Sequence, residues 1–135
     1  MNISGRTRLF PIIGDPVVGV VSPPAVNAWF QANAIDACMM PLNIPASNIT
    51  GFWEMLRASN TFLGCSITYP HKQSAYAQVD TMTESATRLG ALNTVRRADD
   101  GSLCGDATDG TALLQAIGQA GARVNGACVH ITGAG

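Results

Sequence analysis

The chain has 135 residues, of which 47% are hydrophobic and only 13% are charged, and its formal net charge is −1. This length suits one domain of common size. The eight Lys and Arg form no basic stripe, no run approaches the roughly 18 apolar residues of a membrane span, and the first residues lack the apolar stretch of a signal peptide. We therefore expect a cytoplasmic protein that binds neither nucleic acid nor membrane.

The first half of the chain alternates strand and helix patterns. The apolar run over 8–13 predicts a strand, and apolar residues at helical spacing follow Ser22 and Pro23. Ser22 is the predicted N-cap of that helix, with Pro23 as its first residue. A second strand is expected over 37–44, where Pro41 indicates an edge position or a bulge.

The middle of the chain repeats this alternation. A helical stripe runs from Ile49 to Leu56, with Ser47 as its predicted cap. The next strand, over 62–67, leads into a short helix at about 70–77.

The last third adds a capping box, a hairpin and a further helix. Thr81-Met82-Thr83-Glu84 predicts a helix that ends at Gly90. Strands over 91–97 and 102–105 form a predicted hairpin, and a helix is expected over about 109–118. An apolar run over 126–132 predicts a final strand.

This order of elements predicts the fold class. Strands that alternate with helices favour a three-layer α/β domain with a mostly parallel sheet and helices on both faces. Ligands bind such sheets beyond the carboxyl ends of the strands. Four polar segments should meet there, over 14–22, 66–72, 93–94 and 105–110.

The end of the chain resembles the opening of a dinucleotide-binding turn. The strand pattern over 126–132 runs into Gly133-Ala134-Gly135, which is the first part of G-x-G-x-x-G. We expect residues 1–125 to form one domain and 126–135 to be the truncated start of a Rossmann cofactor domain, with Gly133 and Gly135 as cofactor-binding residues. A natural short chain is the alternative.

Lys72 and Asp109 are the candidate catalytic pair. Interconversion of an alcohol and a ketone needs a group that takes and returns the hydroxyl proton. A lysine can do this when desolvation lowers its pKa, and a carboxylate can hold the ammonium in place. The alternative for each residue alone is a surface lysine and a helix N-cap aspartate.

Further polar residues could contact a hydroxylated ligand. Ser66 and Thr68 share one face at a strand end, and the amide of Asn93 can donate and accept at once. Ser22 at a helix N-terminus could bind a carboxylate. Strand-end capping and a turn asparagine are the alternatives.

The sequence supports no metal or redox site. The four cysteines (38, 65, 104 and 128) include no C-x-x-C pair, and the two histidines, His71 and His130, have no partner at a ligand spacing. We expect free thiols in a reducing compartment.

In this order the motifs resemble the N-terminal, substrate-binding domain of the shikimate dehydrogenase family. The resemblance rests on four strings that together span essentially the whole chain: Gly14-Asp15-Pro16 with Ser22-Pro23, Thr68-Tyr69-Pro70-His71-Lys72, Gly90-Ala91-Leu92-Asn93-Thr94-Val95, and Thr108-Asp109-Gly110. It implies NADP- or NAD-dependent reduction of 3-dehydroshikimate to shikimate, in aromatic amino-acid synthesis, with the cofactor bound mainly by a domain absent from this chain.

The resemblance also implies residue roles. Lys72 and Asp109 match the family's catalytic pair, Thr68 and Asn93 match ligands of the substrate hydroxyls, and Ser22 matches one of two serines that bind the substrate carboxylate. A homodimer is a further possibility that the sequence leaves open.

Three positions depart from the family pattern. Val20 stands where the family has the second serine, Ser66 stands for an asparagine, and Ala107 replaces the asparagine of Asn-Thr-Asp-Gly. Valine cannot donate to a carboxylate, which removes a bond worth about 1.5–3 kcal/mol. These changes favour a paralogue that acts on a related cyclic hydroxy acid such as quinate. A binding or regulatory module without catalysis is the other alternative.

Overall fold

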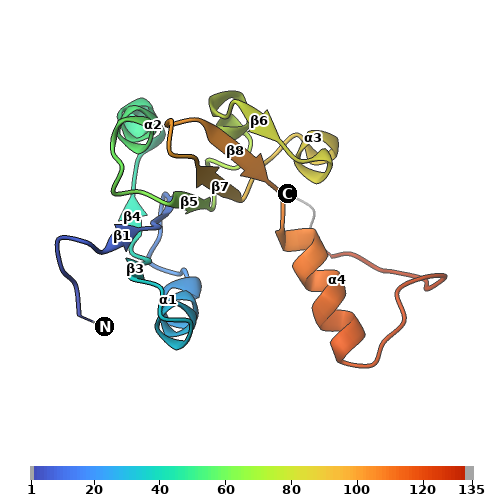
Figure 1. The fold of residues 1–135 in the computed structure, drawn as a ribbon. Coiled ribbons are helices and arrows are strands. Elements are labelled where there is room, and N and C mark those ends of the chain that lie inside the picture. The colour runs from blue at the N-terminus through green and yellow to red at the C-terminus, as the bar shows by residue number, and fades with distance from the viewer. Residues whose placement is uncertain (1, 133–135) are drawn as a thin grey trace.

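The computed structural model describes residues 2–132, and a six-stranded sheet is its centre (Figure 1). The strand order is β4-β2-β5-β7-β8-β6, and three of the five neighbouring pairs are parallel. The strands are β2 (Ile12–Gly14), β4 (Pro41–Asn43), β5 (Gly64–Ile67), β6 (Thr81–Met82), β7 (Thr94–Arg97) and β8 (Leu103–Asp106). The α/β class with a mostly parallel sheet is confirmed, and β7–β8 is the predicted hairpin.

A two-stranded ladder continues the sheet toward the N-terminus. β1 (Arg8–Leu9) pairs in parallel with β3 (Ala37–Cys38), in line with β2 and β4. Each of the two predicted long strands is therefore split in two. Pro11 has no N–H to donate, which interrupts the ladder of the first strand. Pro41 lies on the edge strand β4, as its missing donor predicts.

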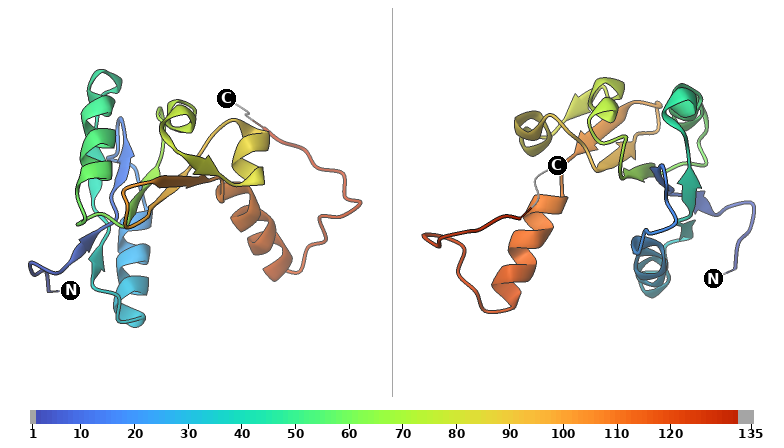
Figure 2. Two further views of the ribbon diagram at one scale, coloured as in Figure 1. Left: turned by 45° about the horizontal axis from the view of Figure 1, so that its top comes forward. Right: turned by 180° about the vertical axis from the view of Figure 1, so that it is seen from behind.

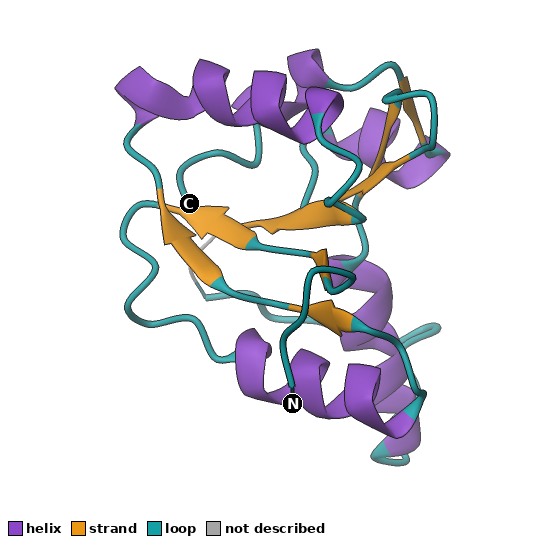
Figure 3. Ribbon diagram, turned by 60° about the vertical axis from the view of Figure 1, so that its left-hand side comes forward, coloured by secondary structure: helices purple, strands orange, loops and turns teal. Residues whose placement is uncertain are grey.

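Helices lie on both sides of the sheet (Figure 3). They are α1 (Ser22–Ala32), α2 (Ile49–Ala58), α3 (Glu84–Leu89) and α4 (Asp109–Gln119), with the short 3₁₀ helices η1 (Ala46–Asn48) and η2 (Ser74–Gln78). Neighbouring residues of β2 point to opposite faces of the sheet, because side chains alternate along a strand. Ile13 packs in the core with Phe52, Trp53 and Leu56 of α2, whereas Ile12 packs with Phe30 of α1.

The helix beginnings differ from the predicted caps. Ser22 is the first residue of α1 and not its N-cap, which is Val21 without a side-chain bond. A cap hydroxyl bonds the second or third helical N–H, and after Ser22 the second residue is Pro24, which has none, so only the N–H of Ala25 would be left for a cap bond. Ser47 likewise does not cap α2, because the turn of η1 leads into that helix.

Two further local predictions are corrected. The helix after β5 is the 3₁₀ helix η2, and it begins at Ser74 and not near residue 70. The cap of α3 is Thr83, whose hydroxyl accepts from the N–H of Ala86, so the capping box centred on Thr81 is wrong. Thr81 instead belongs to β6. Gly90 ends α3 in the left-handed conformation, at φ 62°, as predicted.

Helix α4 and the segment after it project from the sheet (Figures 1 and 2). No residue of α4 is buried, and residues 126–132 form no strand, which corrects that prediction. A strand needs a neighbour for its backbone groups, and Val129 and Ile131 are exposed. No helix among the described residues is long and apolar enough to span a membrane.

Candidate functional site

One edge of the sheet collects the four polar segments that the sequence predicted to meet. β2, β5 and β8 end at this edge, and β7 begins there because it runs antiparallel to both its neighbours. Backbone bonds join the segments: Asp15 N–H donates to Tyr69 O at 2.9 Å, Leu92 N–H to Lys72 O at 2.9 Å, and Asn93 N–H to Asp106 O at 3.0 Å.

Lys72 and Asp109 are in direct contact at this edge. The Lys72 ammonium donates to Asp109 Oδ2 at 2.5 Å, although the residues are 37 positions apart. Lys72 lies in the turn after β5, and Asp109 is the first residue of α4. The two side chains are 40% and 64% exposed, so the pair lies on an open rim and not in the core.

Asn93 fixes the position of Asp109. Its side-chain amide donates to Asp109 Oδ1 and to Thr108 Oγ1, both at 2.9 Å, and its Oδ1 accepts from Thr108 N–H at 2.6 Å. The residue is only 9% exposed. These bonds use both amide hydrogens, so toward a ligand Asn93 has only the second lone pair of its carbonyl oxygen left.

Two adjoining cavities flank Lys72. The larger, of about 470 Å³, lies over the turn after β5, and its lining residues are Thr68, Tyr69, Pro70, Lys72, Gln73 and Ala91. The smaller, of about 90 Å³, has a mainly apolar lining of Lys72, Leu89, Ala91, Leu92, Asn93, Ala107, Asp109 and Gly110. Thr68 lines the larger cavity, Asn93 and Asp109 line the smaller one, and Lys72 and Ala91 line both.

The remaining predicted recognition residues do not line these cavities. Ser66 donates to Asn93 O at 3.3 Å. Val20 packs against the cluster of Ile12 and Phe30. The Ser22 hydroxyl is buried and has no hydrogen-bond partner among the described residues. Gly133 and Gly135 lie outside the described residues.

Several polar residues near the site were given no role in it from the sequence. Tyr69 and Gln73 line the larger cavity, and the only signal for them is their place beside Lys72. Asp15 accepts from the side-chain amide of Asn43 at 2.9 Å. His71 is buried and its Nε2–H donates to Ile44 O at 2.7 Å, so its role is structural.

Asp106 joins the end of β8 to the start of α3. It accepts from Thr83 Oγ1 at 2.6 Å, Ser85 Oγ at 3.0 Å and the N–H of Ala107 at 2.7 Å. The hydroxyl of Thr83 is the main cause that lowers the pKa of Asp106, and Ser85 and the Ala107 amide add to it. The carboxylate is therefore charged near neutral pH.

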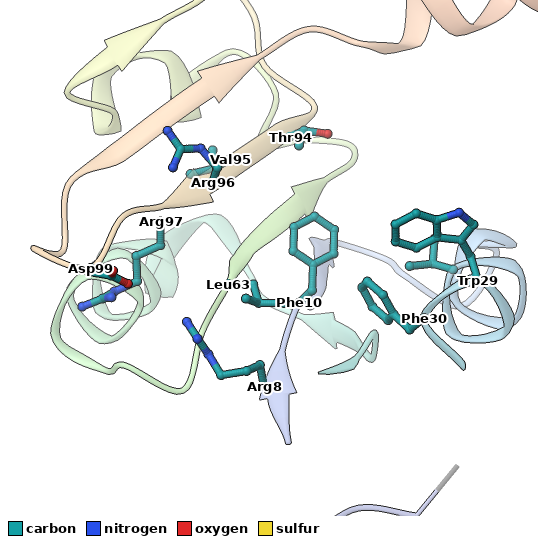
Figure 4. Close-up of a pocket in the computed structure, with 11 residues that line it drawn as sticks. Arg8, Phe10, Trp29, Phe30, Leu63, Thr94, Val95, Arg96, Arg97 and Asp99 are labelled. Carbon is teal, nitrogen blue, oxygen red and sulfur yellow. The ribbon is translucent and has the colours of Figure 1, made fainter. Parts of the chain in front are cut away.

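A further pocket lies beside α1 and shares no lining residue with the two cavities at the site (Figure 4). Phe10, Trp29 and Phe30 gather at one end of it, and Arg8, Arg97 and Asp99 at the other. Its volume is about 520 Å³. Among the described residues, no group of three or more His, Cys, Asp or Glu is placed to hold a metal ion.

Comparison with known proteins agrees with the α/β fold. Residues 12–95 match the shikimate dehydrogenase substrate binding domain. The NADP(+) shikimate dehydrogenase of Rubrobacter xylanophilus is 39% identical over 99% of this chain and 47% of its own length. That of Rhodospirillum rubrum is 36% identical over 87% of the chain and 41% of its length.

Solved structures give the same picture. The shikimate 5-dehydrogenase of Listeria monocytogenes, in complex with shikimate and NAD, has a TM-score of 0.85 at 28% identity, over 92% of this chain and 42% of that one. The 5-ketofructose reductase of a Gluconobacter species has a TM-score of 0.79 at 25% identity, over 86% and 41% of the two chains.

These matches define a substrate-binding domain of the α/β dehydrogenase class. The chain belongs to the shikimate dehydrogenase substrate-binding domain family, and it spans less than half the length of these relatives.

Proposed function

We propose that this chain is the substrate-binding part of an NADP(H)-dependent dehydrogenase that interconverts a ketone and a secondary alcohol on a small polyhydroxylated compound. The observation that carries this proposal is the direct Lys72–Asp109 contact at the mouth of a cavity, in a chain of this family. The first candidate reaction is reduction of 3-dehydroshikimate to shikimate, because the curated relatives carry that name.

In this proposal Lys72 and Asp109 handle the proton. The cofactor, when bound, supplies the hydride to the carbonyl carbon. The Lys72 ammonium donates a proton to the carbonyl oxygen in reduction, and the neutral amine takes it back in oxidation. Asp109 holds the ammonium toward the cavity through its Oδ2.

The recognition residues follow from their place around the cavity. The Thr68 hydroxyl bonds a substrate hydroxyl directly, since Thr68 lines the larger cavity. Asn93 accepts from a second hydroxyl while it keeps Asp109 in place. Ser66, Ser22 and Val20 lie behind this surface, so we propose that they shape the loops and contact the substrate only if these loops shift.

The cofactor would contact the open rim of the site. The exposure of Lys72 and Asp109 leaves that rim accessible from outside the domain, which fits a cofactor held mainly by a second domain. We propose the same division as from the sequence, with residues 1–125 as the substrate domain and 126–135, with Gly133 and Gly135, as the start of the cofactor domain. NADP is favoured over NAD because the Rubrobacter xylanophilus and Rhodospirillum rubrum relatives carry NADP(+) in their names, whereas the Listeria monocytogenes structure holds NAD.

Other substrates fit the same chemistry. Quinate is a second cyclic acid with the same type of secondary alcohol. A neutral keto-sugar is favoured by the similarity to a 5-ketofructose reductase. A binding module without catalysis would keep the cavity, but it would have no use for a lysine that is held by a carboxylate at the cavity mouth.

A titration of this chain tests the proposal. Shikimate and quinate are added up to millimolar concentration while the backbone amide signals are followed. Saturable shifts at Thr68, Asn93 and Asp109 are expected, with no shift at Gly101, in the turn between β7 and β8 at the opposite end of these strands. Cofactor-dependent turnover by the complete enzyme then separates a dehydrogenase from a binding module, which would bind the same ligands without turnover.

A further inference from the structure

The connection between β8 and α4 consists of two residues, Ala107 and Thr108, and it leads directly to Asp109. Both of its backbone N–H groups are held by side chains. The N–H of Thr108 donates to Asn93 Oδ1 at 2.6 Å, and the N–H of Ala107 donates to Asp106 Oδ1 at 2.7 Å. Asn93 also bonds to Asp109 itself. Two side-chain acceptors therefore fix the path of the chain into Asp109.

Asp106 shares the same carboxylate oxygen with the start of α3. Its Oδ1 accepts from Thr83 Oγ1 at 2.6 Å and from Ser85 Oγ at 3.0 Å. Thr83 is the N-cap of α3, and its own N–H donates to Gly105 O at 3.1 Å. Figure 1 shows α3 beside the end of β8, where α4 begins. One charged oxygen thus joins the beginnings of two helices, and bonds to a charged acceptor are stronger than bonds between neutral groups.

These bonds set the width of the smaller cavity beside Lys72. Its lining comes from the turn after β5, from the segment that ends α3 and leads into β7, and from the start of α4. The body of α4 gives the last of these no support, because none of its residues is buried. The bonds of Asp106 join the segment of α3 to the segment of α4, although Asp106 itself lines neither cavity at the site.

We propose that Asp106 is a positioning residue for the Lys72–Asp109 pair. This inference rests on the proposed function and adds a residue to its site. Without Asp106 the N–H of Ala107 and the two hydroxyls lose their common acceptor, so the connection to Asp109 can shift. A displacement of about 1 Å at a catalytic group can lower the rate by about a hundredfold. Asp106→Ala should lower kcat of the complete enzyme by about tenfold or more and leave KM nearly unchanged, because the larger cavity is not altered.

The pair can be observed directly, because Lys72 is the only lysine of the chain. Incorporation of lysine labelled with ¹³C and ¹⁵N gives a single lysine side-chain signal, and no ligand or cofactor is needed. Asp109→Asn provides the signal that Lys72 gives without its carboxylate partner. In Asp106→Ala the signal of Lys72 should move at least half of the way from the wild-type position to that of Asp109→Asn.

Asp100→Ala is the matched control. Asp100 also accepts from a neighbouring N–H and a hydroxyl, those of Ser102, at 2.9 and 2.7 Å, but it lies in the turn at the other end of β7 and β8. This variant should leave the signal of Lys72 in place. Asp106→Asn keeps an oxygen acceptor and should keep the signal close to its wild-type position. If Asp106→Ala does not fold, Ser85→Ala removes one of the three donors and should move the signal in the same direction by less.

An unchanged Lys72 signal in folded Asp106→Ala, or in Ser85→Ala where the first variant does not fold, overturns the inference. An equal movement of the signal in Asp100→Ala overturns it too, because the effect would then follow from any lost aspartate. Neither result bears on the proposed function, which turnover by Lys72→Ala in the complete enzyme tests. A signal that moves as expected, together with full turnover by Lys72→Ala, would keep Asp106 as the residue that positions the pair and would refute the proposed function.

Discussion

Asn93 holds Asp109 in place from the neighbouring strand: its amide donates to Asp109 Oδ1 at 2.9 Å, while the other oxygen of Asp109 accepts from Lys72. The carboxylate is thus fixed from two sides, by a neutral donor and by a cation. The orientation of the Lys72–Asp109 pair therefore depends on a residue that the sequence suggested as a substrate ligand or a turn asparagine.

Replacement of Asn93 by alanine should loosen the start of α4. The variant loses the bonds to Thr108 and Asp109 and leaves the Thr108 N–H without its acceptor, which should lower the free energy of unfolding by about 1–3 kcal/mol. Urea denaturation measures this. Asn48→Ala is the control, since Asn48 is exposed and its recorded side-chain bond is with its neighbour Ser47. An equal loss of unfolding free energy in the two variants would contradict a stabilising role for the bonds from Asn93 to Thr108 and Asp109.

Lys72→Ala should strongly lower turnover by the complete enzyme while the fold is kept. Loss of a general acid–base group lowers kcat by about 10²–10⁴-fold, and the half-exposed side chain carries no part of the core. Steady-state kinetics and circular dichroism measure the two effects. Asp109→Asn should lower kcat less, because the ammonium remains. Near-normal turnover in Lys72→Ala would show that Lys72 and Asp109 do not transfer the proton.

Gly14→Ala should disturb the larger cavity. A Cβ at Gly14 would clash with Thr68 Cγ2 and lie 2.8 Å from Tyr69 O, so the loop after β5 must shift. We expect a loss of about 1–3 kcal/mol in stability and weaker ligand shifts at Thr68. Gly19→Ala, in the same loop and with no atom within 4 Å of the added Cβ, is the matched control. If Gly14→Ala changed neither the stability nor the ligand shifts, the end of β2 and the loop after β5 would not be in close contact.

Val20→Ser tests the proposed shift of the loop before α1: with that loop against the substrate, the variant should tighten shikimate binding by up to about tenfold, because a hydroxyl adds a donor that valine lacks. The same change removes an apolar group from the cluster around Phe30, so stability should fall by about 1 kcal/mol. Calorimetric titration and thermal unfolding give the two values. Val18→Ser, at an almost fully exposed position, should change neither. Unchanged affinity in Val20→Ser would place the acid group elsewhere.

Acid should destabilise the fold through three aspartates. The side-chain bond from Arg57 lowers the pKa of Asp80, the Ser102 hydroxyl that of Asp100, and the Thr83 hydroxyl that of Asp106. A lowered folded-state pKa contributes stability above the unfolded value of about 3.9, and this is lost as the pH falls through the folded pKa. Urea midpoints should drop below about pH 4, and Asp106→Asn should flatten part of that drop.

The sequence predicted the parts of the fold that depend on local pattern. The β7–β8 hairpin, the start of α4 at Asp109 and the edge position of Pro41 were all correct. The caps at Ser22, Ser47 and Thr81 were wrong, because a cap depends on which N–H groups the following residues offer and on the turn that leads into the helix. The strand over 126–132 was wrong because a strand also needs a neighbour, which periodicity cannot supply.

The sequence predicted the Lys72–Asp109 pair of the candidate site, but not the hydrogen bonds that hold the surrounding residues in place. Lys72 and Asp109 were chosen as one unit, and they lie in contact. The tether from Asn93 and the network of Asp106, Thr83 and Ser85 were not foreseen, since both depend on the register between β7, β8 and α3. The catalytic roles of Lys72 and Asp109 are predictions, and the variants above test them.

The Lys72–Asp109 pair lies at the anchored end of the projecting helix α4. Asp109 is the first of the eleven residues of this helix, whose body packs on no core and leaves Leu113 and Leu114 exposed at 62% and 51%. A rigid helix of this length is about 16 Å long, so a tilt of about 10° at its anchored start displaces the far end by about 3 Å and the carboxylate hardly at all. The pair thus lies at the point about which the helix would tilt. A domain that binds to the far end of α4 can move without separating Lys72 from Asp109.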